Sequence, residues 1–441
     1  MAQGERIRGV HWLISTLAAM GVFLDGYDLN VIAFSILMIA SVYRISGSSF
    51  LYPLLLSSGL IGMAIGGALF GSMADRIGRK SMFVIDIIMF VVFTALSALA
   101  TNVFEIILFR ILMGIGIGAD YPVSSSLIAE MSPTKSRGML LMYGIMFYWL
   151  GVLVSGAVNY FALSFGPDLA WRIALGFGAA LAVPVIVARW LMPESFRWLK
   201  AAGRDKEAEE TARRVMGEGY YVQPQKEVKV SDLFRDYKWP LIFVLISWFA
   251  FDIGSYGFGF FTPTLYHELG IKSLKTIALF GTLTAPFPII SYLGLMKIAD
   301  RLGRKLPAII GFLAMITVLA VLVPLVKVSP LYLLPLFIIY SSLEQWPGGL
   351  LSFSYSVELF PTKVRGLAQG LATSVSRIGA ILGIFAFDYI KAYGLIYGVI
   401  FFIAFLALAT AVTWLMAPET KGMKLEEIEE RIKRINKKLA L

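Results

Sequence analysis

The sequence predicts an all-α polytopic membrane protein with 12 transmembrane helices in two six-helix halves. Three observations predict this fold. First, 58% of the 441 residues are hydrophobic and only 15% are charged, which excludes an ordinary soluble domain and a disordered chain. Second, apolar runs of about twenty residues, long enough to cross a bilayer, recur along the whole chain. Third, charged motifs of the first half recur in the same order in the second half.

The predicted spans follow one another closely, and a longer charged segment separates the sixth from the seventh. The first run is too long for a cleavable signal and is followed by no cleavage site, so it is interpreted as a span. We expect a first half over residues 1–192, a cytoplasmic linker with amphipathic helices over 193–237, a second half over 238–416 and a cytoplasmic tail over 417–441. The spans are expected to begin near Val10, Phe50, Met82, Phe104, Met139, Ala170, Trp239, Leu274, Pro307, Leu331, Gly366 and Leu395.

The net charge of +10 is distributed unevenly. Most of the 39 Lys and Arg residues fall on one side of the predicted spans, together with both termini and the linker. This bias marks the cytoplasmic side, so the charge indicates topology rather than nucleic-acid binding. We therefore expect both termini to be cytoplasmic. We also expect the protein to be a monomer in the plasma membrane. With no Cys and only His11 and His267, no metal site or other cofactor is expected, and nothing indicates an enzyme.

Duplicated charged turns lie on the predicted cytoplasmic side. D-R-I-G-R-K at residues 75–80 recurs as D-R-L-G-R-K at 300–305, and the E…P-T-K…R-G pattern of 130–138 recurs at 358–366. Two parallel six-helix repeats are an architecture of secondary transporters, whose substrate site lies between the halves. These turns, and the chain over essentially its full length, resemble the major facilitator superfamily.

We expect the duplicated turns to form a cytoplasmic gate. Their charges would pair when the cavity opens outward and separate when it opens inward. The alternative is membrane anchoring combined with helix capping, and we prefer it for the lysines. The expected gate residues are Asp75, Arg79, Glu130, Arg137, Asp300, Arg304, Glu358 and Arg365.

Few ionisable residues fall at membrane depth, where a charge costs at least about 2.5 kcal/mol and is functional by default. Arg377 is expected to be the only mid-membrane cation away from the outer end of the fourth span. It needs an anion, either Asp252 or Glu344 permanently or the substrate in turn. Because acids outnumber bases in the expected cavity, some carboxyls should be protonated part of the time, which provides a basis for proton coupling. The full set is Asp25, Asp28, Asp86, Arg110, Asp120, Asp252, Glu344 and Arg377, from which Asp86 is set aside as a structural acid.

Three motifs resemble the phosphate:proton symporter family. They are F-L-D-G-Y-D-L at 23–29, D-Y-P-V-S at 120–124 and W-x-x-x-D-x-x-x-Y at 248–256. The resemblance implies a proton path through Asp25, Asp28 and Asp120. It also implies a phosphate site that contains Tyr121, Trp248, Asp252 and Tyr256.

The chain departs from that family at three positions. The family's amide side chains on the fifth and tenth spans correspond to Tyr148 and Gly349, and its lysine on the eleventh span corresponds to Arg377. Arginine keeps the charge and offers a planar fork for phosphate or carboxylate. Together with Trp149 and Trp346, these changes predict a more aromatic pocket that also suits an organic anion.

The leading interpretation is proton-coupled symport of a small anion by alternating access, with inorganic phosphate favoured. The alternatives are an aromatic or carboxylic acid:proton symporter, a family that shares D-G-x-D, and a sugar porter. P-E-S-F-R-W-L at 193–199 and P-E-T-K-G at 418–422 resemble the half-end signatures of sugar porters. The expected partners are the small anion, protons and the lipid bilayer. The predicted substrate residues are Tyr121, Tyr148, Trp248, Asp252, Tyr256 and Arg377, and the predicted proton-coupling residues are Asp25, Asp28, Asp120 and Glu344.

Overall fold

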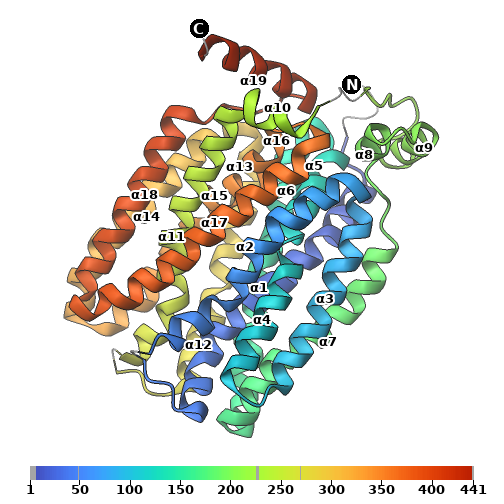
Figure 1. The fold of residues 1–441 in the computed structure, drawn as a ribbon. Helices are drawn as coiled ribbons and strands as arrows, with labels where there is room; N and C mark the ends of the chain where they lie inside the picture. The colour runs from blue at the N-terminus through green and yellow to red at the C-terminus, as the bar shows by residue number, and fades with distance from the viewer. Residues whose placement is uncertain (1–5, 48, 225–227, 269, 440–441) are drawn as a thin grey trace.

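The computed structural model describes residues 6–47, 49–224, 228–268 and 270–439 of the chain, so the outermost residues of both predicted termini lie outside the described part. Over the described residues every regular element is a helix. Ten helices are long and apolar enough to cross a membrane. Figure 1 shows these helices side by side in one bundle, with the short helices α8, α9, α10 and α19 gathered at one end. We call this the gate end, because it carries the charged turns.

The two halves have the same order of helices. The first half contains α1 (Gly9–Tyr43), α2 (Leu51–Ile77), α3 (Arg79–Leu99), α4 (Val103–Ile117), α5 (Asp120–Met131), α6 (Arg137–Ala162) and α7 (Pro167–Trp190). The second half contains α11 (Lys238–Glu268), α12 (Leu274–Thr284), α13 (Pro286–Leu302), α14 (Lys305–Val328), α15 (Leu333–Gly349), η5 (Leu350–Tyr355), α16 (Ser356–Glu358), α17 (Thr362–Ile390) and α18 (Leu395–Met416). The linker forms α8 (Phe196–Ala201), α9 (Asp205–Met216) and α10 (Val230–Arg235), and the tail forms α19 (Leu425–Leu439).

The twelve predicted spans are present, although the fourth, eighth and tenth are interrupted, the eighth at Ala285 between α12 and α13. The fourth span is α4 followed by α5, with a break at Gly118 and Ala119. Pro122 contributes to this break, because it has no N–H to donate to the carbonyl one turn earlier. The tenth span passes from α15 into the π-helical stretch η5 just after Pro347. Interrupted helices at corresponding positions of two repeats are a pointer to a transporter's binding site.

Glycines set the close helix crossings that position the site. A Cβ atom on Gly26 of α1 would lie 1.9 Å from the Tyr148 carbonyl oxygen of α6. A Cβ on Gly379 of α17 would lie 2.4 Å from the Phe249 carbonyl oxygen of α11. Because no larger residue fits at these crossings, glycine allows α1 to approach α6 and α17 to approach α11.

Glycines also join the two halves. A Cβ on Gly67 of α2 would lie 2.8 Å from the Gly370 carbonyl oxygen of α17, and one on Gly71 would lie 2.3 Å from that of Gly366. The glycine-lined faces of these two helices therefore pack directly against each other.

Candidate functional site

A cavity lies between the two halves. It encloses about 1000 Å³ of empty space, its opening included. The interrupted spans reach it, since Tyr121 follows the break in the fourth span and Gly348 precedes η5 in the tenth. All six predicted substrate residues line it, namely Tyr121, Tyr148, Trp248, Asp252, Tyr256 and Arg377. Glu344 lines it as well, so this predicted proton-coupling residue lies beside them.

Arg377 and Asp252 form the central ion pair of the cavity. Arg377 Nη1 donates a hydrogen bond to Asp252 Oδ2 at 2.6 Å, and each residue is only 1% exposed. The guanidinium carbon lies 4.9 Å from the ring centroids of both Tyr121 and Tyr256 and 5.7 Å from that of Trp248. Aromatic rings at these distances stabilise a cation. Asp252, Glu344 and the substrate were the anions expected to pair with Arg377. In this structure Asp252 is its partner.

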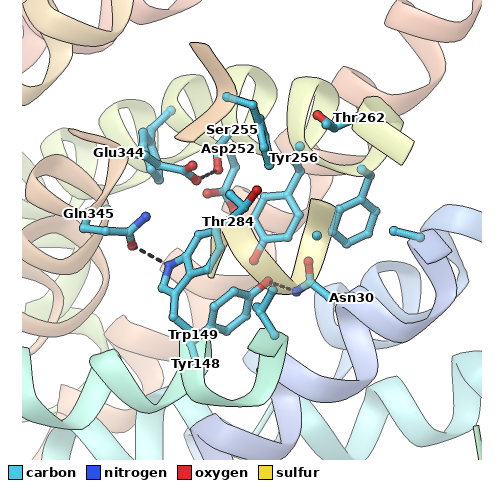
Figure 2. A pocket seen from close by; sticks show the side chains of 18 of the residues that line it. Asn30, Tyr148, Trp149, Asp252, Ser255, Tyr256, Thr262, Thr284, Glu344 and Gln345 are labelled. Atoms are coloured by element: carbon cyan, nitrogen blue, oxygen red, sulfur yellow. Dashed lines mark hydrogen bonds between the residues drawn. The ribbon is translucent and has the colours of Figure 1, made fainter. Parts of the chain in front are cut away.

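Other polar side chains of the cavity are arranged in hydrogen-bonded pairs. Asn30 Nδ2 donates to the Tyr148 hydroxyl at 3.0 Å, and Trp149 Nε1 donates to Gln345 Oε1 at 2.7 Å. The Ser255 hydroxyl donates to a Glu344 carboxylate oxygen, and Figure 2 shows Glu344 beside Asp252 and Ser255 in the cavity. Glu344 forms no ion pair within the described residues.

Asn30 and Gln345 are site residues that the sequence reasoning missed. Each was detectable by position, since Asn30 follows Asp28 by two residues and Gln345 directly follows Glu344. Neither is charged, so neither stands out among the apolar residues of its span.

Asp25, Asp28 and Asp120 do not line the cavity. They are buried inside the first half, where Asp28 Oδ2 pairs with Arg110 Nη2 at 3.0 Å. The predicted proton-coupling residues therefore separate into a buried group in the first half and Glu344 in the cavity. Asp25 is fully buried, and both of its carboxylate oxygens lack a hydrogen-bond partner.

Arg189, at the end of α7, corrects one expectation. It is a fully buried cation that pairs with acids of the expected membrane-depth set, so Arg377 is not the only such cation away from the fourth span. Its partners are Asp120 and, at 2.7 Å, Asp86, the acid that was set aside as structural. Gly21 of α1 makes room for this cluster, since a Cβ there would lie 1.6 Å from Arg189 Nη2. Sequence reasoning missed Arg189 because it lies next to the charged linker and reads as a loop residue.

At the gate end, an aspartate of each half binds the beginning of a helix in the other half. The Asp75 carboxylate accepts hydrogen bonds from the backbone N–H groups of Gly366 and Leu367 in α17, at 3.0 and 2.8 Å. The Asp300 carboxylate accepts from Gly138 and Met139 in α6, at 3.2 and 2.9 Å. The internal repeat relates these two contacts.

Two buried ion pairs also cross between the halves. Arg365 Nη1 lies 2.7 Å from Glu130 Oε1, and Arg137 Nε lies 2.9 Å from Glu358 Oε1. Arg79 pairs with Glu130 and Arg304 pairs with Glu358, each within its own half. All eight predicted gate residues therefore belong to two repeat-related clusters that join the two halves at this end.

The P-E-S and P-E-T motifs support these clusters. Glu194 accepts hydrogen bonds from the backbone N–H groups of Arg79 and Lys80, both at 3.1 Å, at the beginning of α3. Glu419 likewise accepts from Arg304 and Lys305. A carboxylate at a helix N-terminus satisfies free N–H groups and interacts favourably with the helix dipole. Among the described residues, no group of three or more His, Cys, Asp or Glu is placed to bind a metal ion.

Comparison with known proteins is consistent with this geometry. The family model "Sugar (and other) transporter" matches residues 14–432. The chain is 30% identical to the YaaU protein of Escherichia coli (strain K12) over 428 residues, which cover 96% of this chain and 95% of YaaU. It is 27% identical over 435 residues to the niacin transporter NiaP of Acinetobacter baylyi, with 95% of this chain and 96% of NiaP covered.

The fold also matches a solved structure. The proton:xylose symporter XylE from E. coli, bound to 6-bromo-6-deoxy-D-glucose, superposes with a TM-score of 0.83 at 23% identity, over 96% of this chain and 98% of XylE. The family match covers both halves and the linker, so the chain is a multi-pass secondary transporter and not an enzyme. It belongs to the sugar transporter family of the major facilitator superfamily.

Proposed function

We propose that this protein is a proton-coupled symporter of a small organic monocarboxylate, with an aromatic acid favoured. The observation that carries the proposal is Arg377, a cation set among three aromatic rings in the wall of a cavity between two repeats. A guanidinium fork binds a carboxylate through two hydrogen bonds, and aromatic rings around it suit a flat apolar body. The relation to the niacin transporter NiaP is in line with this substrate class.

Inorganic phosphate, the substrate favoured by the sequence motifs, is replaced by this proposal. Neither the matching family model nor the relatives named above are described as transporting phosphate. The cavity is also far larger than phosphate requires, and its walls are mostly aromatic and aliphatic. A compact, strongly hydrated anion would lose part of its hydration against these apolar surfaces.

A sugar is the second candidate. The family is described as transporting sugars among other substrates. Asn30, Tyr148, Glu344 and Gln345 line the cavity and can exchange hydrogen bonds with hydroxyl groups. Because Asp252 neutralises Arg377, the site in its present state also accommodates a neutral ligand.

For the conformational change that follows substrate binding we propose a protonation step at Asp28, which pairs with Arg110. Protonation of Asp28 would break this buried ion pair and loosen the contact between α1 and α4. Two-state packing of this kind links a proton to the alternation between outward-open and inward-open forms. The proposal also includes the plasma membrane as location, cytoplasmic termini with the gate end on the cytoplasmic side, a monomeric state, and the domain boundaries given above.

The test is a thermal-shift panel on purified protein with benzoate, nicotinate, phosphate and xylose, followed by uptake into proteoliposomes with an acidic exterior. A ligand that binds the folded state raises the melting temperature. We expect stabilisation by the aromatic acids and accumulation that an uncoupler abolishes. Stabilisation by xylose alone would establish the second candidate, and stabilisation by phosphate alone would restore the first interpretation.

A further inference from the structure

The ion pair between Arg377 and Asp252 occupies part of the guanidinium that a ligand of the kind proposed above would bind. The aromatic rings of Tyr121, Tyr256 and Trp248 surround the guanidinium, and Asp252 occupies Nη1 at 2.6 Å. Both partners are 1% exposed, so water does not screen their interaction appreciably. A carboxylate ligand therefore competes with Asp252 for the buried guanidinium of Arg377.

Replacement of Asp252 by a ligand carboxylate is unfavourable while Asp252 is ionised. With Asp252 and Glu344 ionised, the cavity already carries one positive and two negative charges, and a monoanion would add a third negative charge. Asp252 would also remain as a buried carboxylate without its cation, which costs several kcal/mol. A proton on Asp252 removes both penalties, because the displaced group is then neutral.

We propose that protonation of Asp252 releases Arg377 for the substrate carboxylate, so that one proton and one organic anion bind together at the same site. This inference rests on the proposed function and specifies how the site is regulated. The proton comes from solvent and adds to an Asp252 oxygen. The ion pair to Asp252 breaks, and an equivalent ion pair forms between Arg377 and the ligand carboxylate, with no covalent bond of the ligand changed.

Asp252 is also placed to hold the proton after the exchange. Its Oδ1 has no hydrogen-bond partner, and neither has Arg377 Nε, so each residue keeps a free polar atom within the pair. Glu344, which reaches Ser255 one turn along α11 from Asp252, is the nearest other acid of the cavity. The titratable and charged groups around the pair are Tyr256 on α11, Arg377 on α17, Glu344 on α15, Tyr121 on α5, Tyr148 on α6, Tyr292 on α13 and, farther away, Asp25 on α1.

The test measures benzoate binding to purified full-length protein by calorimetry between about pH 5 and about pH 8, where benzoate stays ionised. We expect the wild-type Kd to rise about tenfold per pH unit once Asp252 is ionised, because one proton binds with each anion. Asp252→Asn should bind benzoate with a nearly constant Kd over this range. Glu344→Gln should keep the pH dependence.

A control and a second measurement complete the design. Asp168→Asn removes an exposed acid that pairs only with Arg172 among the described residues, and it should behave as wild type. In weakly buffered solution, a pH indicator should report about one proton taken up per benzoate bound by the wild type, which tests the inference even if Asp252→Asn does not fold.

The outcomes separate the two proposals. Benzoate binding with no pH dependence and no proton uptake would overturn the inference and leave the proposed function in place. The inference would likewise be overturned, and the proposed function kept, if Asp252→Asn retained the full pH dependence of benzoate binding while Glu344→Gln lost it. Absence of benzoate binding to the wild type at every pH would overturn both proposals.

Discussion

The two halves of this transporter share a fold and a gate but differ in where their charges lie. In the first half, acids pair with arginines inside the half itself, as Asp28 does with Arg110 and Asp86 with Arg189. In the second half, the pair of Asp252 and Arg377 lines the cavity. A pair inside one half can sense the substrate only through helix packing, whereas a pair in the cavity wall can contact it directly.

Asp28 and Asp252 make this contrast sharpest, because they occupy nearly equivalent positions on α1 and α11, the first helix of each half. Asp28 finds its arginine on α4, and Asp252 finds its arginine on α17. Duplication thus preserved the carboxylate while the cation came from a different helix. A shared backbone does not determine which role a buried acid has.

The largest expected effect is on stability in the first half. Arg189→Ala should destabilise the protein by about 3–5 kcal/mol, because it leaves Asp86 and Asp120 buried without their cation. Arg214→Ala on α9 is the control, since Arg214 and its partner Glu210 are both exposed, and it should cost under about 1 kcal/mol. Thermal unfolding in detergent measures both. Equal melting temperatures for the two variants would show that the Arg189 cluster does not stabilise the first half.

The next effect is on substrate binding in the second half. Arg377→Ala should weaken benzoate binding at least about 100-fold, and Arg377→Lys about tenfold, because lysine keeps the charge and loses the planar fork. Calorimetry at about pH 5 provides the measurement. If the alanine variant binds like the wild type, Arg377 does not contact the substrate, and the contrast between the halves is lost.

The next prediction concerns proton coupling through the buried acids of the first half. Asp28→Asn, which mimics a permanently protonated site, should exchange substrate across a vesicle membrane but fail to concentrate it under an inward pH gradient. Asp120→Asn tests whether the Arg189 cluster shares the proton path. This variant should likewise exchange substrate without concentrating it. Accumulation equal to wild type in either variant would assign that acid a structural role.

The gate should respond in the same way in both halves. Asp75→Asn and Asp300→Asn each weaken hydrogen bonds to the other half, and each should shift the population toward an open gate end by about 1–2 kcal/mol. Labelling of single cysteines introduced at the gate end measures this shift in a chain without native Cys. Unchanged labelling in both variants would favour the anchoring role of these turns.

The smallest effect is expected at the tail, which contacts the linker and the first half. Glu426 pairs with Arg197, and the Met423 carbonyl accepts a hydrogen bond from Arg137. Burial opposes ionisation of Glu426, but Arg197 outweighs it and lowers the pKa of this carboxyl. The pair therefore contributes above the usual glutamate pKa and is lost as the pH falls through the lowered value. Glu426→Gln should shift the equilibrium between the closed and open gate end by less than about 1 kcal/mol, as measured by the same cysteine labelling. A larger shift would make the tail a major part of the gate.

The sequence by itself determined the fold and the outline of the site. Hydrophobic length and repetition specify twelve spans because the bilayer imposes a fixed length on each helix. Buried charges are so costly in such helices that the positions of Asp252, Glu344 and Arg377 within apolar spans are enough to identify a site. The duplicated turns marked residues that the structure brings together in two clusters, because charges in order at matched positions are seldom accidental.

Only the tertiary structure decided which charges meet. Asp28 and Asp252 look alike in sequence, and the partner of each depends on how neighbouring helices are rotated and how closely glycines let them approach. Arg189 resembles a linker residue in sequence, yet α7 places it beside Asp86 and Asp120. Asn30 and Gln345 are neutral, so their place in the cavity depends on helix orientation alone. Pairing between distant helices is a property of their packing, and a one-dimensional pattern of apolar and charged residues does not encode it uniquely.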